Sequence, residues 1–553
     1  MSLALDSDSF DRFDEFSAAG FRVPQFDPRV MRKATTAAPT WVHLGAGNFF
    51  RSVHAIVAQA MLDGGHETGI VLANLRDHTV VENSRRTDDL FVNVVMNADG
   101  TIDPALIASV AESAQLASDA ATGWDRMSAV FRQSSLQLVT LTITEKGYQT
   151  VDASGEALPE IADDVDCGPA RNRTAIPALA SLLLTRFHAG GTPIALMSTD
   201  NFSDNGDRLA QAVRSIADLW VASGQAPAEF ADYVSDRQRV AYPSTMVDRI
   251  TPSPSPAVAA MLAERGLIGA DVRERSGGGP LASFSNTEST SYLVVEDDFP
   301  NGRPPFELAG VLVGDRELVS RADRMKVCTC LNPLHTAMAV VGCLLGFTRI
   351  AHMMDDCDIR ALVEGVGRHE GLPVADTPSG LDPAAFLAEV IDVRLPNPGL
   401  PDSPQRIATD TSQKLGIRFG ETIRRHVDVG DAQHLTWIPF AIAAWVRYLL
   451  GVDDDLAPFE RSPDPLLPAI DNRLKGMRIG DPETASSARD LLADEAIFGV
   501  DLVSVGLAPT VEGHLGAMLA GAGAVRRTLH RLADSTRPEH TAKPSAAARS
   551  NHS

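Results

Sequence analysis

A short apolar strand that runs directly into two glycines constrains the fold of this chain more than any other feature. Residues 41–44 (WVHL) precede Gly45-Ala46-Gly47, and apolar side chains then recur at helical spacing from Val53 to Met61. Gly64-Gly65 ends that predicted helix, and residues 69–73 read as a second buried strand. The sequence therefore predicts a βαβ unit in which a glycine turn opens the helix.

The same alternation continues further along the chain. Residues 136–143 and 193–197 read as buried strands. A helix is predicted between them from Pro177 to Phe187, because proline suits a first helical position. Strands that alternate with helices indicate a parallel sheet covered on both faces. The N-terminal half is therefore predicted to be an α/β, Rossmann-like domain.

The pattern changes after a Pro/Ser-rich stretch at 251–256 and a glycine run at 276–280. Beyond about residue 287 it becomes mostly helical, as in residues 336–347 and 437–450. We therefore expect a mainly α-helical C-terminal domain. The expected divisions are a polar lead-in at 1–38, the Rossmann-like domain at 39–286, the helical domain at 287–534 and a disordered tail at 535–553.

Composition limits the partners of the chain. The net charge is −23, from 49 Lys and Arg against 72 Asp and Glu, so nucleic acid and anionic membranes are poor partners. An anionic ligand would need a locally basic pocket. The five cysteines include no CxxC pair, which suits a reducing cytoplasm. We expect no signal peptide in the acidic N-terminus and no apolar run near the roughly 20 residues that span a bilayer.

The glycine loop predicts a dinucleotide site. Glycines after a strand let the backbone approach a pyrophosphate, and Arg51 is placed to add a phosphate contact. The full GxGxxG pattern is not met, because Phe50 occupies the third glycine's position. After the second strand, Asp77 suits a ribose 2′-hydroxyl and Arg76 suits a 2′-phosphate. The choice between NAD and NADP therefore stays open, and a plain strand-to-helix turn is the alternative.

A second group of polar residues lies far downstream, in MKVCTCLNPLHTAMA. Lys326, Asn332 and His335 precede or begin an apolar helix, and they suit the removal of a proton from an alcohol and the binding of an oxyanion. A purely structural alternative makes Asn332 the N-cap of a helix with Pro333 in its first position. Another alternative uses Cys328, Cys330 and His335 to bind a metal.

Seven stretches, in this order, resemble the mannitol dehydrogenase family, the polyol-specific long-chain dehydrogenases/reductases. They are HLGAGNFFR at 43–51, TLTITEKGY at 140–148, STDNFSDNG at 198–206, YPSTMVDRITP at 242–252, VVEDDFPNGRP at 294–304, LNPLHTAMA at 331–339 and RLPNPGLPDSPQRIATDTSQK at 394–414. The resemblance runs from about residue 20 to about residue 530, so it is more specific than any single motif.

The resemblance implies a zinc-independent oxidoreductase with no metal ligands. It would transfer a hydride between NAD, with NADP not excluded, and a secondary alcohol of a polyol or sugar acid. Mannitol–fructose and mannonate–fructuronate chemistry both stay open. The alternatives are a mannitol-1-phosphate 5-dehydrogenase type of activity and a non-catalytic nucleotide-binding sensor. A monomer or small homo-oligomer is expected.

The resemblance also implies roles for individual residues. Lys326 would be the base, Asn332 and Asn201 would stabilise the oxyanion, and His335 would bind a hydroxyl beside the reacting carbon. The residues expected to bind substrate are Arg406, Lys414 and Asp248, the last with an ion pair to Arg249 as its structural alternative. The residues expected to bind the cofactor are Gly45, Ala46, Gly47, Asn48, Phe49, Arg51, Arg76, Asp77 and Glu145.

One departure from the family pattern concerns spacing. The family usually has KxxxxN, whereas Lys326 and Asn332 are separated by one residue more. In a continuous α-helix the extra residue would rotate Lys326 by about 100°. A bulge ahead of Pro333 would restore the geometry.

Overall fold

The computed structural model describes residues 2–75, 77–116, 121–170, 172–275 and 278–536. The chain divides into two units. The first consists of Met1–Met325, Asp376–Asp382 and Asn397–Pro401, and the second of Lys326–Ala375, Pro383–Pro396 and Asp402–Ser553. The tail expected at 535–553 lies outside the described residues except for its first two, which end a helix.

A six-stranded sheet with the order β5-β2-β1-β6-β7-β8 forms the centre of the first unit, and all of its pairings are parallel. Trp41 of β1 is in register with Ile70 on one side and Leu138 on the other. The chain therefore changes direction across the sheet at β1 and β6, the place where parallel α/β sheets bind ligands. The strands are β1 (Trp41–Leu44), β2 (Ile70–Asn74), β5 (Val110–Gln115), β6 (Leu138–Leu141), β7 (Ile194–Ser198) and β8 (Val240–Ala241).

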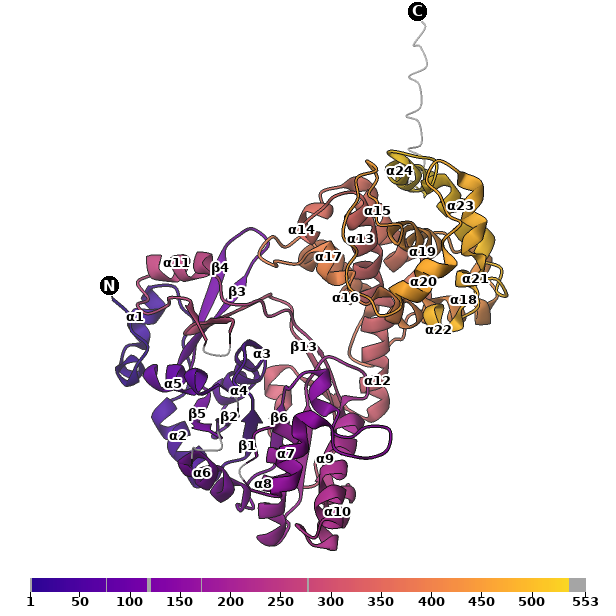
Figure 1. Cartoon of the computed structure of the whole chain (residues 1–553). Coiled ribbons are helices and arrows are strands. Elements are labelled where there is room, and N and C mark those ends of the chain that lie inside the picture. The colour runs from indigo at the N-terminus through magenta and orange to yellow at the C-terminus, as the bar shows by residue number, and fades with distance from the viewer. Residues whose placement is uncertain (1, 76, 117–120, 171, 276–277, 537–553) are drawn as a thin grey trace, which may run out of the picture. The chain divides into compact units, whose positions relative to one another are not determined.

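Helices cover both faces of this sheet (Figure 1). Val42 and Leu44 pack with α6, α8 and α9, while Trp41 faces the opposite core with α3 and α4, as the alternation of side chains along a strand requires. The helices of the first unit are α1 (Phe13–Ala18), α2 (Pro28–Ala37), α3 (Asn48–Ser52), α4 (His54–Asp63), α5 (His78–Arg86), α6 (Ala121–Phe131), α7 (Pro159–Cys167), α8 (Ala175–His188), α9 (Asn205–Ala222), α10 (Ala228–Ser235), α11 (Pro256–Glu264) and α12 (Arg316–Arg324), with 3-10 turns η1 (Ser7–Asp11), η2 (Glu145–Tyr148) and η3 (Phe306–Ala309).

Smaller sheets surround the large one. They have the orders β12-β3-β4, β14-β13-β9 and β10-β11. Because β13 pairs with β9 on one side and with β14 on the other, the first unit extends beyond the boundary that we expected near residue 287. The strands are β3 (Phe91–Met96), β4 (Ile102–Ile107), β9 (Thr245–Asp248), β10 (Arg273–Glu274), β11 (Pro280–Leu281), β12 (Phe284–Thr287), β13 (Tyr292–Glu296) and β14 (Leu312–Gly314).

The segment at 1–38 is folded, in contrast to the polar lead-in that we expected. Leu3, Leu5, Phe16 and Phe21 are buried and pack in one cluster with β3, β4 and α11. Burial of these apolar side chains offsets the entropy lost when a polar segment becomes ordered.

The second unit is helical. Its helices α13 and α19 are buried nearly all around, as expected for the central helices of a helical domain, and α19 packs against α13 and α23. The helices are α13 (Asn332–Leu344), α14 (Ile350–Met353), α15 (Cys357–Glu364), α16 (Pro383–Glu389), α17 (Pro404–Ile407), α18 (Glu421–Val429), α19 (Trp437–Tyr448), α20 (Leu467–Arg473), α21 (Arg489–Leu492), α22 (Glu495–Phe498), α23 (Ala508–Met518) and α24 (Ala524–Thr536).

Short π-helical and 3-10 turns lie between these helices. The π-helical turns are η4 (Met325–Cys330), η5 (Gly365–Gly371), η7 (Val390–Arg394) and η9 (Gly416–Gly420), and the 3-10 turns are η6 (Leu372–Val374), η8 (Thr411–Gln413), η10 (Ala432–His434) and η11 (Pro482–Ala488). The predicted fold class, a Rossmann-like domain followed by a mainly helical one, is confirmed.

One helical stretch, Arg316–Leu344, is long and apolar enough to cross a membrane by length and composition alone. We had expected no apolar run of this length. The structure buries 83% of its apolar window, as in the core helix of a soluble protein.

Candidate functional site

The glycine loop joins β1 to α3 and needs its two glycines for different reasons. Gly45 has a φ of +119°, and a β-carbon there would lie 3.3 Å from the carbonyl oxygen of Thr142. Its amide donates to the carbonyl of Ala73 at 2.8 Å, which ties the loop to the end of β2. A β-carbon on Gly47 would meet no atom within 4 Å. Glycine is therefore needed at position 45 for its positive φ and its close contact with Thr142, whereas glycine at position 47 leaves open space beside the loop.

Gly47 is also one of the residues that line a cavity of about 640 Å³. Its wall includes the glycine loop and residues that follow the carboxyl ends of β2 and β6, among them Asn74, Thr142 and Ile143. The cavity thus lies beside the point where the strand order reverses, which is the usual ligand position in such sheets. Its volume is within the range of small-molecule and cofactor sites.

Only some of the expected cofactor residues line this cavity. Gly45, Ala46, Gly47 and Asp77 do, together with Lys146. The carboxylate of Asp77 accepts hydrogen bonds from the amide of Thr79 at 3.0 Å and its hydroxyl at 2.5 Å, and so caps α5. Arg76 lies outside the described residues.

The remaining expected cofactor residues lie elsewhere around the loop. Asn48 and Phe49 begin α3 and are not part of the cavity wall. Glu145 forms an exposed ion pair with Arg208 at 2.6 Å. Arg51 is buried, and its Nη1 donates to the carbonyl of Ala282 at 2.7 Å. Arg51 therefore holds the chain just after β11 in this structure. Our expectation was that it would face a phosphate of the cofactor.

Several cavity residues carry no signal in the sequence. Gln149, Glu160, Thr174 and Arg275 line the cavity, although they come from segments far apart along the chain. No motif marks any of them, because their approach to the glycine loop depends on how the helices and the β10–β11 hairpin pack. Lys146, which lies in η2 shortly after the carboxyl end of β6, is the one that strand position could indicate.

Asn201 lies in an exposed loop after β7 that is fastened by its neighbours. The carboxylate of Asp200 accepts hydrogen bonds from the amides of Ile143 at 2.8 Å and Thr144 at 3.1 Å, and from the hydroxyl of Tyr148 at 2.5 Å. Burial, and then the charge of Asp200, raise the pKa of Tyr148 above its usual range, so this phenol stays a donor. The start of the Asn201 loop is thus fixed to the end of β6.

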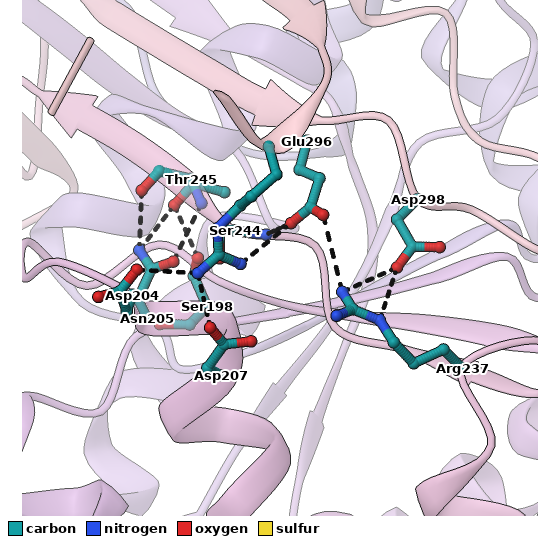
Figure 2. A network of polar contacts seen from close by, with 10 residues as sticks. Ser198, Asp204, Asn205, Asp207, Arg237, Ser244, Thr245, Glu296 and Asp298 are labelled. Carbon is teal, nitrogen blue, oxygen red and sulfur yellow. Dashed lines mark hydrogen bonds and ion pairs between the residues drawn. The ribbon is translucent and has the colours of Figure 1, made fainter. Parts of the chain in front are cut away.

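A polar network fixes the far end of the same loop (Figure 2). The amide group of Asn205 donates to the hydroxyl of Thr245 at 2.9 Å and accepts from its backbone amide at 3.0 Å. Arg316, at the start of α12, forms ion pairs with Asp204 at 2.9 Å and Asp207 at 2.7 Å. Loops held at both ends in this way present side chains in a narrow range of positions.

Asp248 is buried at the end of β9, opposite Tyr292 of β13. The structural alternative paired it with Arg249. The guanidinium of Arg249 instead donates to the carbonyls of Ser52 at 2.6 Å and Glu288 at 3.3 Å. Burial lowers the pKa of Arg249 to about 10, against the opposing charge of Glu288.

The other expected catalytic residues belong to the second unit. Lys326 is buried in the π-helical turn η4, and Asn332 and His335 are half-buried in the first turn of α13. The amide of Leu331 donates to the carbonyl of Lys326 at 3.1 Å, a π-type bond across five residues. The expected bulge is therefore a wide helical turn, and it accommodates one residue more than an α-helical turn would.

This turn removes the capping role that we considered for Asn332. The N-cap of α13 is Leu331, with no side-chain capping bond, and Asn332 is the first residue of the helix. The physical reason is that residues 325–330 are already helical, so the chain does not enter α13 from an extended cap. The side-chain amide is thus not used as a cap.

Arg406 and Lys414 lie on segments near α13. α17, which carries Arg406, packs against α13, and η9 follows Lys414 and also contacts α13. Arg406 is 72% exposed and pairs with Asp402 at 2.6 Å, a hydrogen-bonded pair that raises its pKa. Lys414 donates to the carbonyl of Thr409, and burial followed by the charge of Arg418 lowers its pKa. The structure thus gathers these two cations on the helical unit with Lys326, Asn332 and His335.

The metal-binding alternative finds no support in the described part of the chain. Within it, no group of three or more His, Cys, Asp or Glu residues is arranged to bind a metal ion. Cys328 and Cys330 are buried, and burial raises the pKa of Cys330 to about 11, which disfavours the thiolate that a metal needs.

A glycine loop at the switch point of a parallel sheet, followed by a helical unit, defines a Rossmann-type α/β protein with a separate helical domain. Residues 39–307 match the model of the mannitol dehydrogenase Rossmann domain, and residues 320–516 match that of the mannitol dehydrogenase C-terminal domain. The chain belongs to the mannitol dehydrogenase family. This confirms the resemblance found in the sequence.

Individual relatives agree with this assignment. The D-mannonate oxidoreductase of Thermotoga maritima is 44% identical over 520 residues, which cover 93% of this chain and 96% of that protein. The D-mannonate oxidoreductase of Escherichia coli is 30% identical, over 76% of this chain and 83% of that protein. A solved structure of Pseudomonas fluorescens mannitol 2-dehydrogenase, in ternary complex with NAD and D-mannitol, has a TM-score of 0.68 at 24% identity and covers 97% of this chain and 100% of that one. The last likeness shows the fold.

Proposed function

We propose that the chain is an oxidoreductase that transfers a hydride between NAD, with NADP as the alternative, and a secondary alcohol of a polyol or sugar acid. The cavity beside Gly47 carries this proposal, because it offers open space at the switch point of a Rossmann-type sheet in a member of this family. Among substrates we favour D-mannonate and its keto-uronate product, since the relative with 44% identity is a D-mannonate oxidoreductase.

The residues around the cavity fit a dinucleotide. Gly47 leaves room where a side chain would intrude, and Asp77 and Lys146 supply polar groups at the ends of β2 and β6. A dinucleotide held there would supply the hydride acceptor or donor. The chain's contribution at this cavity is to bind and orient, which can supply a large share of a rate enhancement.

The proton has to be handled by side chains of the protein. We assign its removal from the hydroxyl to Lys326, whose burial excludes water from the amine. Asn332 and Asn201 are proposed to donate to the oxygen as negative charge develops on it, an interaction that can be worth several kcal/mol. His335 is proposed to orient the neighbouring hydroxyl.

The substrate's carboxylate is assigned to the cations of the helical unit. Arg406 can donate two parallel hydrogen bonds to a carboxylate, and Lys414 adds a second positive charge. Their present partners, the carboxylate of Asp402 and the carbonyl of Thr409, are groups that a substrate oxygen would replace or share. Asp248 is proposed to line the substrate pocket. A cytoplasmic location, a monomer or small homo-oligomer, and no nucleic-acid or membrane partner complete the proposal.

The test is an absorbance assay of the reduced cofactor. Purified protein is mixed with NAD or NADP and with D-mannonate, D-mannitol, mannitol 1-phosphate and further polyols and aldonates. We expect turnover with D-mannonate and none in the Lys326→Ala variant. Dinucleotide binding without turnover of any substrate would favour the sensor instead, and turnover of mannitol 1-phosphate alone would replace the proposed substrate.

A further inference from the structure

Arg275 is one of the cavity residues that the motifs and the family resemblance leave without a role. It lines the cavity together with the glycine loop, although more than 220 residues separate the two in sequence. It directly follows β10, and its amide donates to the carbonyl of Gly279 at 2.9 Å. The question is what a guanidinium does on the wall of this cavity.

The base of the hairpin is anchored beside the loop. The carbonyl of Ala282, just after β11, accepts a hydrogen bond from Arg51 of α3 at 2.7 Å and one from Asn83 of α5 at 3.4 Å. These two helices follow β1 and β2, the strands that end at the cavity. One buried and one part-buried hydrogen bond therefore anchor the end of the hairpin that carries Arg275.

Gly279 lies against the guanidinium of Arg275. Gly279 has a φ of +89°, and a β-carbon there would lie 2.9 Å from Nη2 of Arg275. A glycine at this position thus satisfies the turn and leaves room for the arginine side chain. Nε of Arg275 is buried and has no hydrogen-bond partner within the described residues. Buried donors usually have partners, so this one calls for an explanation.

Two cations and two carboxylates line the cavity, and a second guanidinium lies close to one of the cations. The pKa of Arg51 is lowered to about 10. Burial is the largest cause of this shift, and the positive charge of the nearby Arg275 is the second. Lys146 also lines the cavity, and so do the carboxylates of Asp77 and Glu160. The two guanidinium groups repel each other, and the charge of Asp89 opposes the effect on Arg51 as a smaller cause than Arg275. A chain with a net charge of −23 also needs local cations to admit a polyanion.

We propose that Arg275 binds a phosphate group of the dinucleotide in this cavity. The inference rests on the proposed function, since it assigns a further residue to the same cofactor site. Its planar fork of donors matches phosphate oxygens, and the buried Nε is one of the donors that a phosphate would satisfy. The phosphate is either the pyrophosphate of both dinucleotides or the 2′-phosphate of NADP, and the experiment below separates the two.

The experiment compares equilibrium binding of NAD and NADP to the full chain and to three variants, by calorimetry at low and high salt. The variants are Arg275→Ala, Arg275→Lys and the matched control Arg273→Ala, which removes an exposed arginine of the same hairpin that is not part of the cavity wall. Thermal unfolding of each variant shows that the fold is retained.

We expect Arg275→Ala to weaken binding by about tenfold, the usual effect of losing a hydrogen bond to a charged group. We also expect it to reduce the salt dependence of binding, because one cation–phosphate contact is lost. Arg275→Lys should recover part of the affinity, and Arg273→Ala should bind as the parent does. Equal weakening of NAD and NADP assigns the pyrophosphate, and weakening of NADP alone assigns the 2′-phosphate.

Two results would overturn the inference in distinguishable ways. If the parent binds a dinucleotide and Arg275→Ala binds both as tightly with the same salt dependence, the role of Arg275 is wrong and the proposed function stands. If the parent binds neither NAD nor NADP, the proposed function fails and the inference fails with it.

Discussion

The backbone amide of Leu331 donates to the carbonyl of Lys326 at 3.1 Å, so the proposed base lies at the start of a π-helical turn. The turn contains the residue by which this chain exceeds the usual family spacing between its lysine and asparagine. Such single wide turns within helices recur at functional sites, because they accept an extra residue without ending the helix. The extra residue is therefore compatible with a working lysine.

Replacement of Lys326 by alanine should abolish turnover and leave dinucleotide binding unchanged. A general base contributes about 10²- to 10⁴-fold to rate, and kcat should fall by at least that factor. The dinucleotide cavity is lined by residues of the first unit, so the dissociation constant of NAD should stay within about twofold of the parent value. Steady-state kinetics and calorimetry measure the two quantities. Activity near that of the parent would show that another group is the base.

Valine at position 47 should block cofactor binding in a protein of normal stability. The φ of Gly47 is −75°, and a β-carbon there meets no atom within 4 Å, so the variant should fold normally while its side chain fills the cavity. Alanine at position 45 should instead lower the stability of the protein. A φ of +119° costs about 1 kcal/mol or more in any residue except glycine. Urea unfolding and NAD titration of the pair test the assignment. Unchanged NAD affinity in Gly47→Val would place the cofactor elsewhere.

Asparagine in place of Asp200 should loosen the loop that carries Asn201. The carboxylate accepts three hydrogen bonds, from Ile143, Thr144 and Tyr148, and an amide can accept them only in part. We expect a loss of about 1–3 kcal/mol in the free energy of unfolding and a lower kcat. Asp218→Asn, at an exposed position of α9, is the control. Equal stability and activity in the two variants would contradict a fastening role for Asp200.

Acid should destabilise the first unit through two buried histidines. The pKa of a histidine in the unfolded chain is about 6.5. Burial lowers the pKa of His54 to about 3, and burial also lowers the pKa of His43. Between these values the unfolded state binds a proton that the folded state does not, so the free energy of unfolding rises with pH. The contribution of these neutral histidines to the free energy of unfolding is complete above about pH 6.5. As pH decreases below that value, it falls by up to about 1.4 kcal/mol per pH unit for each histidine.

Urea unfolding between pH 4 and pH 7.5 measures that slope. His54→Gln should reduce the slope, whereas His188→Gln, at an exposed position, should leave it unchanged. A slope in the His54 variant identical to that of the parent would show that this imidazole is protonated in the folded protein.

Removal of the cations at 406 and 414 should weaken substrate binding more than turnover. If these groups bind a carboxylate, Arg406→Ala and Lys414→Met should each raise KM for D-mannonate by about tenfold and change kcat less. KM for uncharged D-mannitol should respond less. Lys475→Met, an exposed lysine of the same unit, is the matched control. Identical effects on the two substrates would argue against a carboxylate partner.

The sequence predicted the β1–glycine–helix unit, the parallel sheet and the helical second domain. The spacing of apolar residues and the positions of glycines depend on the local backbone geometry, so a few neighbouring residues are enough to read them. The Gly64-Gly65 helix stop and the strands near 138 and 194 were predictable for the same reason. The ordered seven-motif resemblance gave the family. These inferences required no knowledge of which distant segments meet.

The tertiary structure alone decided which side chains reach the cavity. Arg51, adjacent to the loop in sequence, is turned toward Ala282, and Arg275, far away in sequence, lines the cavity instead. Likewise, Asn332 has the sequence of a helix cap but follows a turn that is already helical. A short motif specifies the conformation of its own backbone, whereas the direction and partner of a side chain depend on the long-range packing of hairpins and helices around it.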